Sequence, residues 1–243
     1  MPSGYREDLA HVHDSGFGHF AENAGAVVVE ELARAGFRRG RVVDLGCGSG
    51  ITARLLCEAG FDVLGIDQSA PLVERARRRA PAAQFRVGSF VSEEIPPCVA
   101  VTAIGEVFNY GFDESNGAAA RAAVFRRIHA ALAPGGLLVF DLAGPERVPD
   151  TLPARNFFEA DDWAVLVEVN GDRSGRWLTR DVTTFRRTGG LYRRDVERHR
   201  LELVDPADVV ATLERFGLRV RTSPSYGPLE LPKGLVAFLA RKP

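Results

Sequence analysis

The chain has 243 residues, 45% of them hydrophobic and 26% charged, which suits one large globular domain and argues against disorder. Its formal net charge is −1, unlike the strong basic excess of proteins that hold nucleic acid by its phosphates. No apolar run is long enough to span a membrane, and the polar segment Met1–Leu9 lacks the apolar core of a signal peptide, so we expect a cytoplasmic protein without nucleic-acid or membrane partners.

Up to Leu142, segments with the hydrophobic pattern of a strand alternate with segments that have the pattern of a helix. Tyr5–Phe20 is rich in His, Phe and Gly but is not clearly periodic, whereas the apolar spacing of Ala21–Ala35 predicts a helix that ends at Gly36. Strands are predicted at Arg41–Leu45, Phe61–Ile66, Gln84–Val87, Val99–Ile104 and Leu137–Leu142. Helices are predicted at Ile51–Ala59, after a capping Ser69, and at Ala118–Leu132, before the turn Pro134–Gly136. Several strands are apolar without alternation, which is typical of a parallel sheet covered by helices on both faces.

After Asp141 the pattern changes to longer, charged strands. These are predicted at Trp163–Val169, Trp177–Phe185 and Leu191–Leu203, with turns at Asn170–Gly175 and Thr188–Gly190. We interpret them as an antiparallel insert that covers the mouth of a site. Pro206–Phe216 then predicts a helix, and Leu218–Arg221 and Leu235–Ala240 predict the closing strands.

The most informative stretch is the glycine-rich loop Asp44-Leu45-Gly46-Cys47-Gly48-Ser49-Gly50. Glycines at alternate positions after a buried strand let the backbone turn sharply and approach a ligand. The spacing fails for a dinucleotide loop, because Ile51 stands where a third glycine or alanine is required, and no lysine is present for a phosphate loop. Asp67, at the end of the next strand, is suited to accept hydrogen bonds from both hydroxyls of a ribose.

These segments resemble class I S-adenosylmethionine-dependent methyltransferases. Asp44–Gly50 is similar to the first motif of that family, Gly65-Ile66-Asp67-Gln68-Ser69 to its second-strand acidic motif, and Leu132-Ala133-Pro134-Gly135-Gly136 to the turn before its fifth strand. The resemblance implies a Rossmann-like α/β three-layer sandwich. Its seven-stranded, mostly parallel sheet would have an antiparallel last strand, with the β insert after the fifth strand. We expect one methyltransferase domain over residues 1–243: a helical lid (1–36), a cofactor-binding core (37–148), the insert (149–204) and a closing segment (205–243).

The resemblance also implies which residues contact the cofactor, S-adenosylmethionine, which leaves as S-adenosylhomocysteine. Backbone at Gly46 and Gly48 would approach its methionine part, Asp67 would bind its ribose, and Gln68 would lie beside its adenine. Many relatives carry aspartate at the position of Ser89, so this chain departs from the family there. The expected cofactor-binding residues are Asp44, Gly46, Cys47, Gly48, Gly50, Asp67, Gln68, Ser89, Phe90, Gly105 and Glu106.

The chemistry is expected to be in-line displacement at the activated methyl group, by an N, O, S or C nucleophile of a small-molecule acceptor. A base is needed only if the nucleophile arrives protonated, and the candidates are His13, Glu106 and His199. The candidate acceptor-binding residues are His13, Phe17, Tyr110, Trp163 and Tyr192. No metal is expected, because Cys47, Cys57 and Cys98 lack the spacing of metal ligands.

Several alternatives remain open from the sequence alone. The arginines of Arg173–Arg200 are interpreted as a solvated sheet face, with the binding of an acidic substrate as the second reading. The protein is expected to be a monomer or a homodimer. The rival functions are a non-catalytic cofactor- or partner-binding protein on the same fold, a nicotinamide-dependent oxidoreductase, and a protein or RNA methyltransferase.

Overall fold

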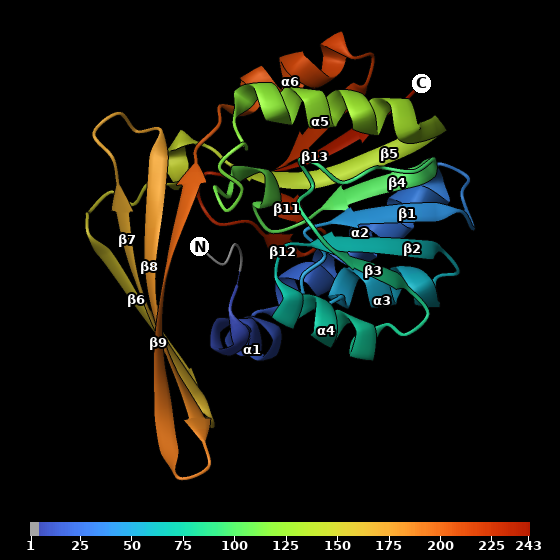
Figure 1. Cartoon of the computed structure of the whole chain (residues 1–243). Helices are drawn as coiled ribbons and strands as arrows, with labels where there is room; N and C mark the ends of the chain where they lie inside the picture. Colours follow the sequence, from blue (N-terminus) through green and yellow to red (C-terminus); the bar gives the residue numbers. More distant parts are fainter. Residues whose placement is uncertain (1–4) are drawn as a thin grey trace.

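The computed structural model describes residues 5–243 and has a seven-stranded sheet at its centre, in the order β10-β13-β5-β4-β1-β2-β3 (Figure 1). β1 to β5 run parallel to one another, and β13 is antiparallel to both of its neighbours. The strands of this sheet are β1 (Arg41–Leu45), β2 (Asp62–Asp67), β3 (Gln84–Val87), β4 (Cys98–Ala103), β5 (Leu132–Ala143), β10 (Arg219–Ser223) and β13 (Leu235–Arg241). The predicted fold class is confirmed.

Helices cover both faces of the sheet. The long helices are α1 (Glu7–Gly16), α2 (Gly18–Arg34), α3 (Ile51–Glu58), α4 (Ala70–Arg79), α5 (Ala118–Ala131) and α6 (Pro206–Arg215), with short 3-10 turns η1 (Val107–Asn109) and η2 (Pro145–Arg147). α5 and α6 pack on one face through residues such as Phe125 and Leu213, and α2 and α3 pack on the other through Val28 and Leu56. Ser69 caps α4 as predicted, because its hydroxyl accepts a hydrogen bond from the Leu72 N–H at 3.2 Å.

A second, four-stranded antiparallel sheet follows β5. It contains β6 (Ala154–Ala160), β7 (Trp163–Gly171), β8 (Trp177–Thr188) and β9 (Leu191–Glu202), in that order, and extends beyond one end of the main sheet (Figure 1). Asn109 fastens it to the core: its side chain bonds both backbone groups of Ala143 and donates to the Glu202 carbonyl. The insert is therefore fixed where β4 and β5 end.

The structure departs from the sequence-based elements at four places. α1 and the start of α2 occupy the segment without clear periodicity, because α1 is held by packing and ion pairs across to other elements. β6 was not predicted, since its residues are mostly exposed and do not alternate. β5 starts before Pro134–Gly136, which a register shift against β4 accommodates. A small hairpin, β11 (Ser225–Tyr226) with β12 (Leu229–Glu230), was also missed.

Within residues 5–243, no helix is long and apolar enough to cross a membrane.

Candidate active site

The glycine loop after β1 has a backbone that only glycine adopts easily. Gly46, Gly48 and Gly50 all have positive φ, at 64°, 54° and 79°. The N–H groups of Gly46 and Cys47 both donate to the Ile66 carbonyl, which holds the loop against the end of β2. A Cβ on Gly46 would stand 2.5 Å from a methyl of Val107, whereas a Cβ on Gly48 would meet nothing within 4 Å. The loop is thus closely packed at Gly46 and open at Gly48.

This contrast predicts different costs for two matched substitutions. Gly46→Ala adds a clash to the strain of a left-handed alanine, so we expect it to lower the free energy of unfolding by about 2–4 kcal/mol. Gly48→Ala should cost only about 1 kcal/mol, because the space beside it is open. Chemical denaturation measures both, and adding Val107→Ala to Gly46→Ala should recover part of the loss. Equal costs for the two alanines would contradict the packing described.

Asp67 lies at the carboxyl end of β2 and supports the loop directly. Its Oδ2 accepts the Gly48 N–H at 2.9 Å, and its Oδ1 accepts the Ser69 N–H at 2.8 Å. Burial raises the pKa of this carboxyl above its ordinary value, although the two N–H groups oppose the shift. The adjacent Gln68 carries a buried Oε1 without a hydrogen-bond partner among the described residues.

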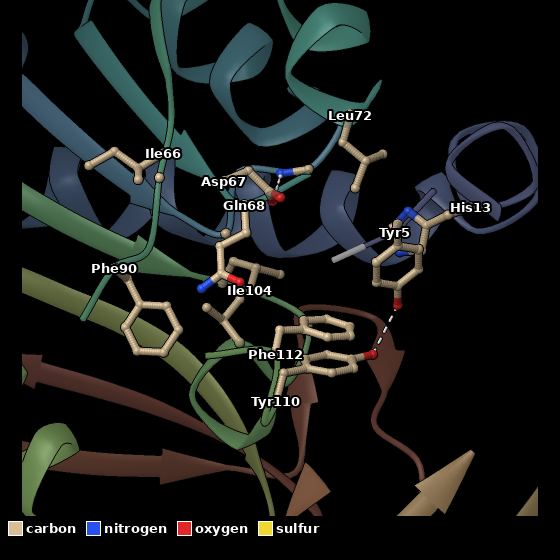
Figure 2. A pocket seen from close by; sticks show the side chains of 15 residues that line it. Tyr5, His13, Ile66, Asp67, Gln68, Leu72, Phe90, Ile104, Tyr110 and Phe112 are labelled. Carbon is tan, nitrogen blue, oxygen red and sulfur yellow. Dashed lines mark hydrogen bonds between the residues drawn. The ribbon is translucent and has the colours of Figure 1, made fainter. Parts of the chain in front are cut away.

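A cavity of about 690 Å³, its opening to solvent included, lies beside the loop. Figure 2 shows Asp67 and Gln68 at one side of it, Tyr5 and His13 of the N-terminal segment at another, and Tyr110 and Phe112 stacked below. Its lining includes five of the predicted cofactor-binding residues besides Gln68: Gly46, Gly48, Asp67, Phe90 and Gly105. Tyr5 and Tyr110 close one side through a 2.9 Å hydrogen bond between their hydroxyl groups.

The remaining predicted cofactor residues do not line this cavity. Gly50 packs on Ala76 of α4, and the Cys47 side chain is buried against Gly65 of β2. The Ser89 hydroxyl donates to a carboxylate oxygen of Asp113 at 2.5 Å, and neither residue lines a cavity. Asp44 lies under the loop, where its Oδ1 accepts the Thr102 hydroxyl at 2.6 Å and its Oδ2 has no partner among the described residues.

A larger cavity of about 1660 Å³, its opening included, adjoins the first. It is enclosed by α1 and the start of α2, by the insert strands and by the segment after β5. Both cavities share a border, formed by Tyr5, His13, Ile104, Gly105 and Tyr110. The predicted acceptor residues Phe17 and Tyr110 line the larger cavity, whereas Trp163 packs behind it against Phe17 and Tyr192 lies exposed at the far end of the insert.

Glu106 lines the larger cavity but is bound to two arginines. Arg180 donates two hydrogen bonds to its carboxylate, of 2.6 and 3.0 Å, and Arg147 donates a third at 3.3 Å. Although burial alone would raise the pKa of Glu106, the arginines hold it below its ordinary value. A carboxylate paired in this way is a weak proton acceptor, so the geometry disfavours Glu106 as the base. Arg180, 16% exposed, is thus an exception to the solvated face predicted for the insert arginines.

The two candidate histidines differ in how their nitrogens are used. His13 borders both cavities, and its buried Nδ1 has no partner among residues 5–243. Desolvation lowers the pKa of His13 below its ordinary value of 6.5, which favours the neutral imidazole. His199 also lines the larger cavity, but its Nε2 lies 3.1 Å from a carboxylate oxygen of Glu197. His13 is therefore the histidine with a free nitrogen at the border.

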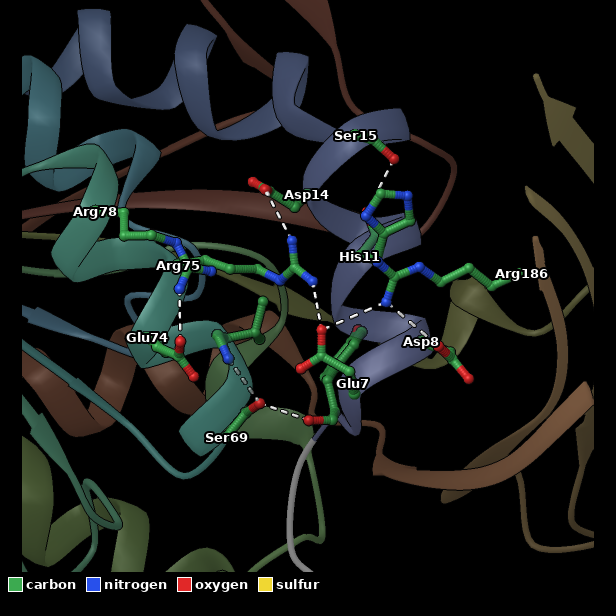
Figure 3. A network of polar contacts seen from close by, with 12 residues as sticks. Glu7, Asp8, His11, Asp14, Ser15, Ser69, Glu74, Arg75, Arg78 and Arg186 are labelled. Atoms are coloured by element: carbon green, nitrogen blue, oxygen red, sulfur yellow. Dashed lines mark hydrogen bonds and ion pairs between the residues drawn. The ribbon is translucent and has the colours of Figure 1, made fainter. Parts of the chain in front are cut away.

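Ion pairs hold α1 over the cavities from two sides (Figure 3). Glu7 and Asp14 pair with Arg75 and Arg79 of α4 at 2.7 and 2.5 Å. Toward the insert, Asp8 pairs with Arg193 of β9. Leu9 and Val12 on the same helix pack against Trp163 and Val165. The N-terminal segment is thus positioned jointly by the core and the insert.

Residues 42–136, which hold the glycine loop and Asp67, match a family model described as a methyltransferase domain. This match assigns that segment, which is less than half of the chain, to the methyltransferase domain family. The match ends before the insert, so the insert lies outside it.

Known relatives agree with this assignment. Trans-aconitate 2-methyltransferase of Paracidovorax citrulli is 32% identical over 124 residues, which cover 50% of this chain and 46% of that protein. The chain spans about half the length of most curated relatives that it matches. The chain also shares its fold with a solved S-adenosylmethionine-dependent methyltransferase from Clostridium acetobutylicum (TM-score 0.81, 16% identity, 96% of this chain and 97% of the other). The same holds for CalS10, an amino pentose methyltransferase from Micromonospora echinaspora solved with S-adenosylmethionine (TM-score 0.77, 19% identity, 99% of each chain).

Several residues around the cavities were not predicted from the sequence. Tyr5, Phe112, Arg147, Phe158 and Arg180 line one or both cavities. Each comes from a different element or loop, so no local spacing joins them. The surplus of arginine in the insert was the one sequence feature that pointed to a charged residue at the site. It did not distinguish Arg180 from its exposed neighbours.

Proposed function

We propose that this methyltransferase binds S-adenosylmethionine in the smaller cavity and transfers its methyl group to a small molecule in the larger one. The observation that carries the proposal is their shared border, where His13, Ile104 and Gly105 line both. A methyl donor on one side and an acceptor on the other would meet there, and bringing them together in line can lower the barrier by about 7–11 kcal/mol. The enclosure of the larger cavity by the lid and the insert suits a small molecule better than a protein or RNA substrate.

The polar groups beside the glycine loop fit this cofactor. Gln68 lines the cavity, and its buried Oε1, which has no partner among residues 5–243, is an acceptor for a ligand that carries hydrogen-bond donors, as the cofactor's amino groups do. Asp44 Oδ2 also has no partner among these residues but lies under the loop, from where it would hold a cofactor amino group through water. Asp67 reaches the cavity from the end of β2, where a carboxylate is suited to bind ribose hydroxyls. Gly48 leaves the space beside it open for the methionine part. These residues would hold the cofactor.

The cofactor supplies a methyl group already activated by a sulfonium. The protein's part is to position the acceptor, exclude water and, where the nucleophile carries a proton, to accept that proton. Nδ1 of His13 is the atom suited to that task, because it is unpaired and the imidazole is neutral. Glu106 instead fixes Arg180 and Arg147 through its carboxylate.

The affinity for S-adenosylhomocysteine is expected to depend on pH through Asp44. Burial raises the pKa of Asp44 to about 7, so much of the carboxyl is protonated at neutral pH in the free protein. A cationic amino group favours the ionised form, and affinity should therefore rise by about tenfold from about pH 6 to about pH 8. Isothermal titration across this range measures the effect. Asp44→Asn should remove it, and a slope that persists in this variant would assign it to another group.

The first test of the proposed function compares two cofactor classes. The purified protein is titrated calorimetrically with S-adenosylhomocysteine and, in parallel, with NADH. We expect binding of the first, with a dissociation constant in the micromolar range or below, and none of the second, because Ile51 replaces the third small residue of a dinucleotide loop. Binding of NADH alone would contradict the proposal and favour an oxidoreductase.

A further inference from the structure

The larger cavity carries one more positive than negative formal charge. The residues lining it with a formal charge at neutral pH are Arg147, Arg180 and Glu106, with the histidines left aside. Arginine remains protonated throughout the physiological range, so deprotonation cannot remove the surplus. Glu106 already binds both guanidinium groups, and its single negative charge neutralises only one of their two positive charges. A ligand that fills this cavity and displaces its water meets an uncompensated cation.

Arg147 is the arginine whose guanidinium has hydrogen-bond donors without partners among residues 5–243. Its Nε bonds Glu106 at 3.3 Å, whereas no hydrogen bond from its two Nη atoms is found among residues 5–243. Arg147 lines the larger cavity and not the smaller one, and its side chain is 28% exposed. We infer that these two donors are available to a ligand on the acceptor side. The planar pair of N–H groups matches the two oxygens of a carboxylate.

The rest of the lining is mainly apolar. Leu9, Val12 and Phe17 of the lid face Val165, Val167 and Val182 of the insert. Such walls suit a hydrocarbon or aromatic body. A single surplus positive charge matches a monoanion, whereas a phosphate dianion would leave a negative charge uncompensated.

We propose that the acceptor is an apolar organic carboxylate, and that Arg147, supported by Arg180 and Glu106, holds its carboxylate group. This inference rests on the proposed function and specifies its substrate class. The carboxylate is the anchor, and the atom that receives the methyl group lies toward His13 at the border with the smaller cavity. Arg147 is thus a residue that determines acceptor specificity.

The test uses the 243-residue protein saturated with S-adenosylhomocysteine. It is titrated calorimetrically with phenylpropanoate and octanoate and with their uncharged amides, phenylpropanamide and octanamide. At least one acid should bind at least about tenfold more tightly than its amide. Arg147→Gln should remove this preference and leave the affinity for S-adenosylhomocysteine unchanged. Arg155→Gln, which alters an exposed arginine on the insert, should leave both unchanged.

Four results would overturn the inference. Three concern the acceptor: acids and amides that bind equally, no binding of either acid by the loaded protein, or an acid affinity that Arg147→Gln does not change. The fourth is a loss of affinity for S-adenosylhomocysteine in Arg147→Gln, since Arg147 would then serve the cofactor. Failure of the wild type to bind S-adenosylhomocysteine is a separate outcome, which contradicts the proposed function itself. The two failures are therefore distinguishable.

Discussion

Replacement of Asp67 by alanine is expected to weaken binding of S-adenosylhomocysteine by about 100-fold or more, because two charge-assisted hydrogen bonds to the ribose are lost. The same carboxylate accepts the N–H groups of Gly48 and Ser69, so the loop also loses part of its support. Isothermal titration of the variant against the wild type measures the change.

Two variants separate the ligand contact from the support of the loop. Asp67→Asn keeps the size and one acceptor oxygen but removes the charge, and it should still weaken binding by at least about tenfold. Asp62→Ala alters a half-exposed carboxylate at the other end of the same strand and should leave binding unchanged. If Asp67→Ala folds normally and binds as tightly as the wild type, Asp67 does not contact the cofactor.

Replacement of His13 by asparagine is expected to lower kcat by about 100-fold to 10,000-fold for an acceptor whose nucleophile arrives protonated. The variant removes the unpaired Nδ1 at the border between the cavities. Because burial lowers the pKa of His13 below 6.5, the neutral, active imidazole persists at mildly acidic pH. The wild-type kcat should therefore be flat above about pH 6.5 and fall only below it.

The control for this variant lies on the same helix. His11 pairs with Asp162 at 2.9 Å and lines neither cavity, so His11→Asn should retain the wild-type rate and pH profile. The affinity for S-adenosylhomocysteine is measured for both variants, which separates a loss of chemistry from a loss of cofactor binding. A wild-type kcat in His13→Asn, with such an acceptor, would exclude the histidine as the base.

The elements around the proposed cofactor site were predictable because their signals are local. A buried strand, a glycine loop and a helix follow one another between Arg41 and Glu58, and the acidic end of β2 comes soon after. Each signal depends on the backbone conformation or burial of a few consecutive residues. The bounds of β1 and β3 were predicted to the residue for this reason. The same local chemistry places Asp67 beside Gly48.

The lining of the proposed acceptor site was not predictable in the same way, because long-range contacts determine it. α1 has weak periodicity, and its place depends on partners as distant in the chain as Arg75 and Arg193. The environment of Glu106 depends on Arg147 and Arg180, which approach it from after β5 and from β8. The sequence supplied Glu106 as a candidate base, and only the folded arrangement shows that both its oxygens are occupied by arginines.

The central claim is that the donor and the acceptor occupy adjoining cavities, and a crystal structure of the complex with S-adenosylhomocysteine tests it most directly. The account predicts that the ribose lies on Asp67 and that the sulfur lies at the border formed by His13, Ile104 and Gly105, facing the larger cavity. A ligand bound elsewhere, or a sulfur turned away from the larger cavity, would contradict the account.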